Sequence, residues 1–311
     1  MSLLSYFPAV SVHMLTSFRL DQGEAALKEL KVSTPSSHAS SISPNVSSTT
    51  KSHTPPAVVN LLITSIFADV SRNALKWLPG CPLQSTAEVL QHLDKLPRFK
   101  SPVELTKVLD SPWTEAEKLL SWICETHGDK LQLATDEFHI SGFPDRVVQL
   151  ILNKPDAKRH SHFIKQMKSK SQESILLFHG TDCGYLWSIL SGGFKPSGDT
   201  RFGPGNFMAE EPVTSYAYAT KGIAGPKWKN ANEGGLMFGC QVLGKGRPVR
   251  DGSAGAGGIH VINDLSSIAI RYIFLLPPQD LRLYPSPTAP SRAAVRSTMM
   301  NAFKKFPDPE M

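Results

Sequence analysis

The sequence predicts an α+β protein in which a helical domain precedes a domain of short strands. Its 311 residues are enough for about two domains of ~150 residues each. Helix-start signals recur between residues 57 and 171, whereas after Ser174 the apolar runs are short and separated by glycine-rich stretches. This change of pattern favours a set of helices followed by a sheet of mostly short strands.

The bulk composition is that of a soluble, intracellular protein. Apolar residues make up 41% of the chain, and the net charge of +6 permits an anionic ligand. Nucleic acid is not indicated, because no Lys/Arg block with interleaved aromatic residues is present. The 4 cysteines form no CxxC pair and fit reduced thiols better than disulfides or a zinc site. No apolar run reaches the ~18–20 residues of a membrane span. We therefore expect a location in the nucleus or cytoplasm.

The N-terminal segment, 1–56, is expected to be disordered. Its second half, 31–56, is rich in Ser, Thr, Pro and His and has almost no large apolar side chains that could offset the entropy of ordering. The first half has no acidic residue before Asp21, as in transit peptides, but it lacks their arginine enrichment.

Helix starts are clear in the predicted helical domain, 57–171. Ser85 and Thr114 are each followed three residues later by a glutamate, which is the pattern of a capping box. Ser101 has the same pattern with Pro102 at the first helical position.

The rest of the helical domain contains a helix that ends at Gly128, a short apolar run at 145–152 and a further helix at 155–167. Packing and scaffolding are its expected role. Its histidines have no metal-ligand spacing, so no metal site is expected. They are His127, His139, His160 and His162.

The second domain, 172–285, is expected to hold the chemistry, and 286–311 to form a flexible tail. Helices are expected at 185–191 and 212–220. The candidate strands are 175–178, 236–243, 260–262 and 268–276.

The first of these strands ends at the polar step His179-Gly180-Thr181. A capped amphipathic segment follows and closes at a Gly-Gly pair, which predicts a strand, a turn and a helix. Strand ends hold side chains rigidly and often carry functional groups. His179 alone is more typical of a structural histidine, so its interpretation depends on residues downstream.

The glycines at 203 and 205 do not form a dinucleotide-binding fingerprint. The third glycine of G-x-G-x-x-G would fall at Met208, and no strand precedes them in a βαβ unit. The sequence has no Walker A motif either. Instead, Phe207 is followed by Ser215 and Tyr218, which lie one helical turn apart. The three side chains could line one pocket, although helix packing alone would also explain them.

Taken together, these pieces resemble the catalytic domain of the poly(ADP-ribose) polymerase (PARP) superfamily, the diphtheria-toxin-like ADP-ribosyltransferases. The resemblance covers roughly residues 172–280 and includes the hydrophobic strand 270–275. It implies a split β-sheet preceded by a helical domain, as in the mono-ADP-ribosylating branch. The matching pieces, in family order and spacing, are His179-Gly180-Thr181, Gly192-Gly193-Phe194, Gly205-x-Phe207-x-Ala209 and Ser215-x-x-Tyr218.

The resemblance implies a role for each matched residue. His179 would donate a hydrogen bond to the adenosine ribose of NAD. Gly180 would bind the nicotinamide carboxamide through its backbone, helped by the Ser215 hydroxyl. Tyr218 would stack on the cationic nicotinamide ring and Phe207 would close its other side, adding ~0.5–2 kcal/mol of attraction. The implied NAD-binding residues are His179, Gly180, Thr181, Phe207, Ser215 and Tyr218.

Two departures from the family pattern affect the expected activity. Phe207 stands where the family usually has tyrosine, so stacking is kept and a hydroxyl is lost. Ile259, 12 residues before Arg271, stands at the third motif position, where polymerising members have glutamate. An isoleucine cannot accept a hydrogen bond or activate a growing chain. Asp251 and Asp264 are other carboxylates that could lie near the site.

The resemblance therefore implies an NAD-dependent mono-ADP-ribosyltransferase with a protein acceptor, or a nucleic-acid acceptor, and with His179, Phe207 and Ile259 at the catalytic positions. A catalytically inactive module that binds NAD or a partner protein is the alternative. RNA 2′-phosphotransferase chemistry occurs on the same fold, but its basic RNA-binding residues are not evident here.

Overall fold

The computed structural model places residues 48–311 in one compact unit. Of the predicted disordered segment, 1–56, only the last three residues are described. The described residues are 54–72, 78–110, 114–135, 137–170, 173–196, 203–219, 227–231, 234–244, 247–249, 258–277 and 289–306.

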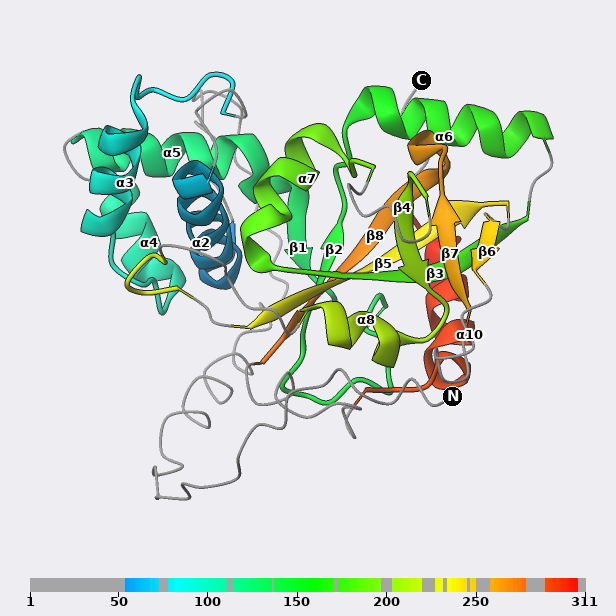
Figure 1. Ribbon diagram of the computed structural model, residues 1–311. Coiled ribbons are helices and arrows are strands. Elements are labelled where there is room, and N and C mark those ends of the chain that lie inside the picture. Colours follow the sequence, from blue (N-terminus) through cyan, green and yellow to red (C-terminus); the bar gives the residue numbers. More distant parts are fainter. Residues whose placement is uncertain are drawn as a thin grey trace, which may run out of the picture. The chain divides into compact units, whose positions relative to one another are not determined.

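The first part of this unit is helical, as predicted, and is organised around α2 (Pro56–Arg72). Every residue of α2 from Val58 to Val70 is buried, so the helix runs through a core rather than along a surface. Helices α3 and α5 pack around it (Figure 1). The other helices of this part are α3 (Thr86–Lys95), α4 (Pro102–Leu109) and α5 (Glu115–His127).

The predicted helix starts are confirmed. Ser85 and Thr114 form complete capping boxes. The hydroxyl of Ser101 accepts from the Glu104 amide, but the Glu104 carboxylate accepts from the backbone of Lys100 instead of Ser101. Gly128 is the C-cap of α5, as predicted, and a Cβ there would lie 2.5 Å from the Thr54 hydroxyl oxygen, so the position needs a glycine. A 3-10 turn, η3 (Gly128–Lys130), follows.

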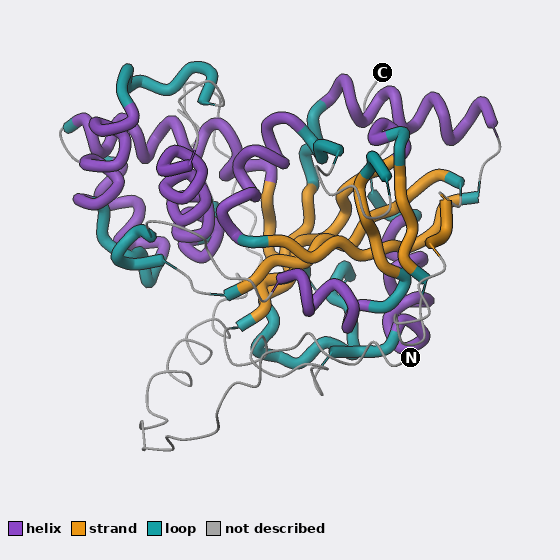
Figure 2. The backbone as a smooth tube through the Cα atoms, viewed as in Figure 1, coloured by secondary structure: helices purple, strands orange, loops and turns teal. Residues whose placement is uncertain are grey.

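The remaining elements include an antiparallel sheet with the strand order β1-β2-β8-β5-β3-β4-β7-β6 (Figures 1 and 2). This confirms the α+β class. The strands are β1 (Leu131–Leu133), β2 (Val148–Leu152), β3 (Ser174–Thr181), β4 (Asn206–Ala209), β5 (Gly235–Leu243), β6 (Arg247–Val249), β7 (Ile259–Ile262) and β8 (Ile268–Leu276).

The sheet nearly divides between β3 and β4. β3 pairs with β5 along its whole length, whereas its register with β4 is the single pair Phe178 and Ala209. The strands on one side of this point are β1, β2, β8, β5 and β3, and on the other side β4, β7 and β6. The contact between the two parts of the sheet through β3 and β4 is therefore short.

Helices cover both faces of the sheet (Figure 1). Leu177 of β3 points into the core shared with α2, α5 and α7. Leu176 and Phe178 point the other way, into a core shared with α8 and α10. The helices and 3-10 turns in this part are α6 (Ala157–Lys170), η4 (Cys183–Tyr185), α7 (Leu186–Gly192), α8 (Pro212–Ala219), η5 (Leu265–Ser267) and α10 (Arg292–Phe303).

Two sequence predictions need correction, and one strand was not predicted. The predicted helical domain also contributes β1 and β2, because Val148 and the residues after it pair with β8. The predicted flexible tail contains α10, whose Val295 and Met299 are fully buried against the sheet. Strand β4 had no separate prediction, because its four residues are too few to show alternation.

Candidate functional site

The predicted motif His179-Gly180-Thr181 lies inside strand β3 and not after it. The strand continues past Phe178 because the ladder with β5 continues, pairing these residues with Phe238, Met237 and Leu236. The motif is therefore the last, rigidly held part of β3. The chain then turns through η4 into α7, as predicted.

Gly180 is in close contact with helix α8. A Cβ on Gly180 would overlap the carbonyl oxygen of Ser215 and would lie 3.2 Å from the backbone nitrogen of Ala219. Ser215 itself is buried. The glycine is thus needed for the approach of a helix, and the same approach brings Ser215 beside the Gly180 peptide.

His179 bridges the point where the sheet divides. Its Nδ1 lies 2.8 Å from the carbonyl oxygen of Phe207 in β4. Because a carbonyl can only accept, Nδ1 carries the hydrogen and donates it. The imidazole therefore links β3 to β4 just beyond the single pair of Phe178 and Ala209.

The ring of His179 is packed among aromatic side chains. The ring centroid of Phe194 lies 5.0 Å away in an edge-on arrangement, and that of Phe238 lies 6.4 Å away. Burial lowers the pKa of His179, and the bond to Phe207 opposes this only in part. A neutral ring with hydrogen on Nδ1 has a lone pair on Nε2, so Nε2 is a hydrogen-bond acceptor.

Phe207 and Ile259 lie on the same face of the β4 and β7 ladder. Phe207 pairs with Val261, and Ile259 pairs with Ala209, so the two side chains are diagonal neighbours. Ile259 is buried and Phe207 is half-buried. The structure thus brings Phe207 and Ile259 together, and the Phe207 carbonyl connects β4 to His179.

The outer side of α8 presents Tyr218. This side chain is 46% exposed, whereas Tyr216 on the same helix is buried. Tyr218 lies one turn after Ser215 in α8, as predicted. Ser215 contacts Gly180 of β3, and the next residue, Thr181, is the last of that strand. Part of the Tyr218 side chain therefore faces solvent.

The sequence did not indicate how the motif is tied to its surroundings. Asp182, directly after the motif, accepts a hydrogen bond from Gly184 at 2.6 Å and lies 3.5 Å from the Arg72 guanidinium of α2. The guanidinium also lies over the ring of Tyr185, 4.5 Å from its centroid. Residues 110 positions apart in the chain make this contact, so no local pattern could reveal it.

A second unpredicted network surrounds Glu210. Its carboxylate lies 2.7 Å from Nε2 of His260 and 2.6 Å from Nη1 of Arg292 in α10. The backbone of Arg292 donates to Glu211. Glu210 directly follows β4 and contacts His260, whose partner Met208 lies on the face opposite to Phe207, so this carboxylate links β7 to α10.

The other two candidate carboxylates do not join the described site. Asp264 caps η5 by accepting from Ser266. Asp251 lies outside the described residues. All four cysteines are free thiols, and burial raises the pKa of Cys124 and Cys183 to about 12.

In the part of the chain that the structure describes, no group of three or more His, Cys, Asp or Glu side chains could hold a metal ion. Among those residues no helix has the length and apolar character of a membrane span. Known protein-family models and curated proteins gave no match to the chain.

Proposed function

We propose that the chain is an NAD-dependent mono-ADP-ribosyltransferase of the PARP type, acting on a protein or nucleic-acid acceptor. One observation carries the proposal. Residues that the resemblance assigns to one NAD site, although up to 80 positions apart in the chain, meet at the division of the sheet. His179 bonds to Phe207, Gly180 contacts Ser215, and Ile259 lies beside Phe207. The near-division of the sheet also supports the PARP-type fold.

The groups present fit the nicotinamide half of NAD. The Gly180 peptide lies against the backbone of Ser215, and the proposal assigns recognition of the carboxamide to this peptide and to the Ser215 hydroxyl. The exposed ring of Tyr218, one turn further along α8, supplies an aromatic face for a cationic ring. This attraction weakens when nicotinamide leaves as a neutral molecule, so it favours binding and does not itself explain rate.

The structure sharpens the role proposed for His179. With Nδ1–H donated to Phe207, the neutral ring offers Nε2 as an acceptor. The proposed bond to the adenosine ribose therefore runs from the sugar hydroxyl to His179, opposite to the direction expected from the sequence. His179 then positions NAD and does not act as a general base.

The proposed reaction breaks the bond between the nicotinamide nitrogen and C1 of its ribose. The acceptor nucleophile forms the new bond to C1, nicotinamide leaves with the bonding electron pair, and the acceptor releases a proton. The chain contributes by fixing the reacting ribose in place and excluding water. Ile259 gives the site an apolar side chain where chain elongation needs a carboxylate, which supports transfer of a single ADP-ribose.

Labelled NAD tests the proposal with two matched variants. In His179→Asn the amide nitrogen can still donate to the Phe207 carbonyl, but the Nε2 acceptor is gone. We expect label transfer to fall about tenfold or more, the equivalent of ~1.4 kcal/mol. His179→Gln retains a polar group near the Nε2 position and should lose less. Equal transfer by wild type and both variants, or no transfer to protein or added RNA, would contradict the transferase proposal.

A catalytically inactive NAD-binding module is the second candidate, favoured by Phe207 and Ile259 at the two other motif positions. Calorimetric titration with NAD separates the two, because binding without label transfer would support the module. Phe207→Tyr restores the family residue on the same half-buried face. We expect it to use NAD as well as wild type or better. Loss of activity in this variant would contradict the placement of Phe207 in the site.

A further inference from the structure

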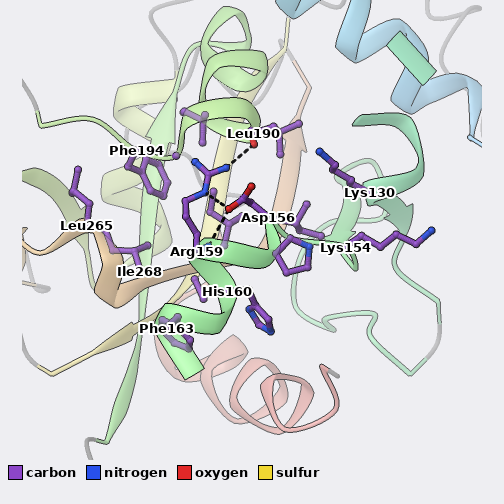
Figure 3. A pocket seen from close by; sticks show the side chains of 16 residues that line it. Lys130, Lys154, Asp156, Arg159, His160, Phe163, Leu190, Phe194, Leu265 and Ile268 are labelled. Carbon is purple, nitrogen blue, oxygen red and sulfur yellow. Dashed lines mark hydrogen bonds and ion pairs between the residues drawn. The ribbon is translucent and has the colours of Figure 1, made fainter. Parts of the chain in front are cut away.

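A pocket separate from the motif residues lies between α6, α7 and the start of β8 (Figure 3). It contains none of the implied NAD-binding residues. Its lining includes Phe194, whose ring centroid lies 5.0 Å from that of His179.

The two sides of this pocket differ in character. Lys130 and Lys154 come from one side and Phe194, Leu265 and Ile268 from the opposite side, as Figure 3 shows. The two lysines thus lie at one end and the apolar surface at the other, and Arg159 lies between them with its guanidinium toward Leu190. A ligand that fits both ends must itself be amphipathic.

The charged groups that line the pocket leave an excess of positive charge. Lys130, Lys154 and Arg159 contribute three positive charges and Asp156 one negative charge, which gives +3 − 1 = +2. Asp156 lies 3.6 Å from Nε of Arg159 and also accepts from the Arg159 amide. The carboxylate of Asp156, the one acidic side chain of the lining, is therefore already paired with Arg159.

Hydrogen bonds hold the cations in place. Nη2 of Arg159 donates to the carbonyls of Leu190 and Ser191 at the end of α7. Nζ of Lys130 lies 3.2 Å from Nδ1 of His127, so the ammonium donates to the ring. His127 then carries its hydrogen on Nε2 and donates it to the Ser191 hydroxyl at 2.8 Å. These hydrogen-bond partners are uncharged, and Arg159 is in addition paired with Asp156.

Desolvation makes this arrangement unfavourable for the protein alone. It lowers the pKa of Lys130, and the neighbouring Arg159 lowers it further, against an opposing effect of Asp156. An anion bound at this end of the pocket would restore the favourable interaction that burial removes.

We propose that this pocket binds a small organic anion, with an apolar or aromatic body against Phe194, Leu265 and Ile268 and a phosphate or carboxylate toward Lys130, Lys154 and Arg159. Nucleoside monophosphates and fatty acids share this chemistry. The site does not depend on NAD, although a ligand in it would contact Phe194, whose ring packs edge-on against that of His179.

Fluorescence titration of the full chain with 8-anilinonaphthalene-1-sulfonate, an aromatic sulfonate, tests the proposal. Lys154→Glu reverses an exposed charge at the pocket, and Lys158→Glu makes the same change on exposed α6 surface outside it. We expect Lys154→Glu to raise the dye Kd by ~10-fold or more and Lys158→Glu by less than ~3-fold. Unchanged melting temperatures show that both variants are folded.

Competition identifies the ligand source. Displacement of the dye by AMP alone indicates a nucleotide, and displacement by dodecanoate alone indicates a fatty acid; either result supports the organic-anion site. No saturable dye binding to wild type, equal weakening by both variants, or displacement by neither competitor would overturn the proposal. Label transfer from NAD is not read out in this experiment, so its result is independent of the proposed transferase activity.

Discussion

At the residue scale, both the fold and the candidate site depend on Gly180 having no Cβ atom. A Cβ would overlap the Ser215 carbonyl, so Gly180→Ala must displace α8 from β3. We expect a loss of ~1–3 kcal/mol in the free energy of unfolding, measured by urea denaturation, together with weaker NAD binding. Gly192→Ala is the matched control, because nothing lies within 4 Å of its Cβ position. Equal stability of the two variants would mean that α8 does not rest on Gly180.

His127 gives a pH-dependent prediction at the same scale. Burial, with Lys130 and Arg159 adding to it, lowers its pKa to about 3. Below the unfolded pKa of ~6.5, the unfolded chain takes up a proton that the folded chain does not. The contribution of the neutral His127 to the free energy of unfolding is therefore complete above pH ~6.5. It is lost as the pH falls toward 3, by up to ~1.4 kcal/mol per pH unit.

Urea denaturation from pH 7.5 to 5 measures this effect. His127→Gln should flatten the loss of stability relative to wild type, because the amide cannot take up a proton. His162→Gln, at an exposed position, should keep the wild-type slope. Parallel slopes for wild type and His127→Gln would show that His127 is protonated equally in both states.

At the element scale, what the sequence could predict depended on the range of the interactions involved. Helix starts at Ser85 and Thr114 are fixed by partners three residues away, so their local patterns were sufficient. Long strands such as β5 and β8 were visible as apolar runs. The short strand β4 and the helix α10 were not, because both depend on distant chain segments for their pairing and burial.

The same limit applies to the candidate site. Spacing and family resemblance indicated His179, Gly180, Ser215 and Tyr218, and the structure places Gly180 against Ser215. The bond from His179 to the Phe207 carbonyl could not be predicted, since a backbone acceptor has no sequence signature. The ion pair between Arg72 and Asp182 joins segments with no common motif.

Helix α10 provides the test at this scale. Met299 is fully buried and its Cε approaches Gly239 of β5 so closely that a Cβ there would lie 2.5 Å away. Met299→Ala should cost ~2–5 kcal/mol of unfolding free energy in urea. Arg296→Ala, on the exposed side of α10, should change it by less than ~0.5 kcal/mol. If the two variants are equally stable, α10 is not part of the cooperative fold.

At the scale of the whole molecule, the helical part and the sheet share one core instead of forming separable domains. The amide of Trp187 in α7 donates to the Ser65 hydroxyl of α2 at 2.7 Å. The ring centroid of Trp187 lies 4.9 Å from that of Trp122 in α5 and 4.4 Å from that of His127. Trp187 is fully buried only because α2 and α5 cover it. The boundary predicted near residue 171 therefore marks a change in sequence pattern, whereas the core is continuous across it.

Truncation tests this conclusion directly. A chain that begins at residue 48 keeps the whole compact unit and should melt cooperatively at the wild-type temperature. A chain that begins at residue 128 loses α2 and α5 and exposes Trp187, whose burial alone contributes ~3–5 kcal/mol. Because the net stability of a folded protein is only ~5–15 kcal/mol, the shorter chain should show no cooperative transition in near-ultraviolet circular dichroism. A sharp transition within a few degrees of wild type would instead mean that the sheet, with its candidate NAD site, folds without the helices.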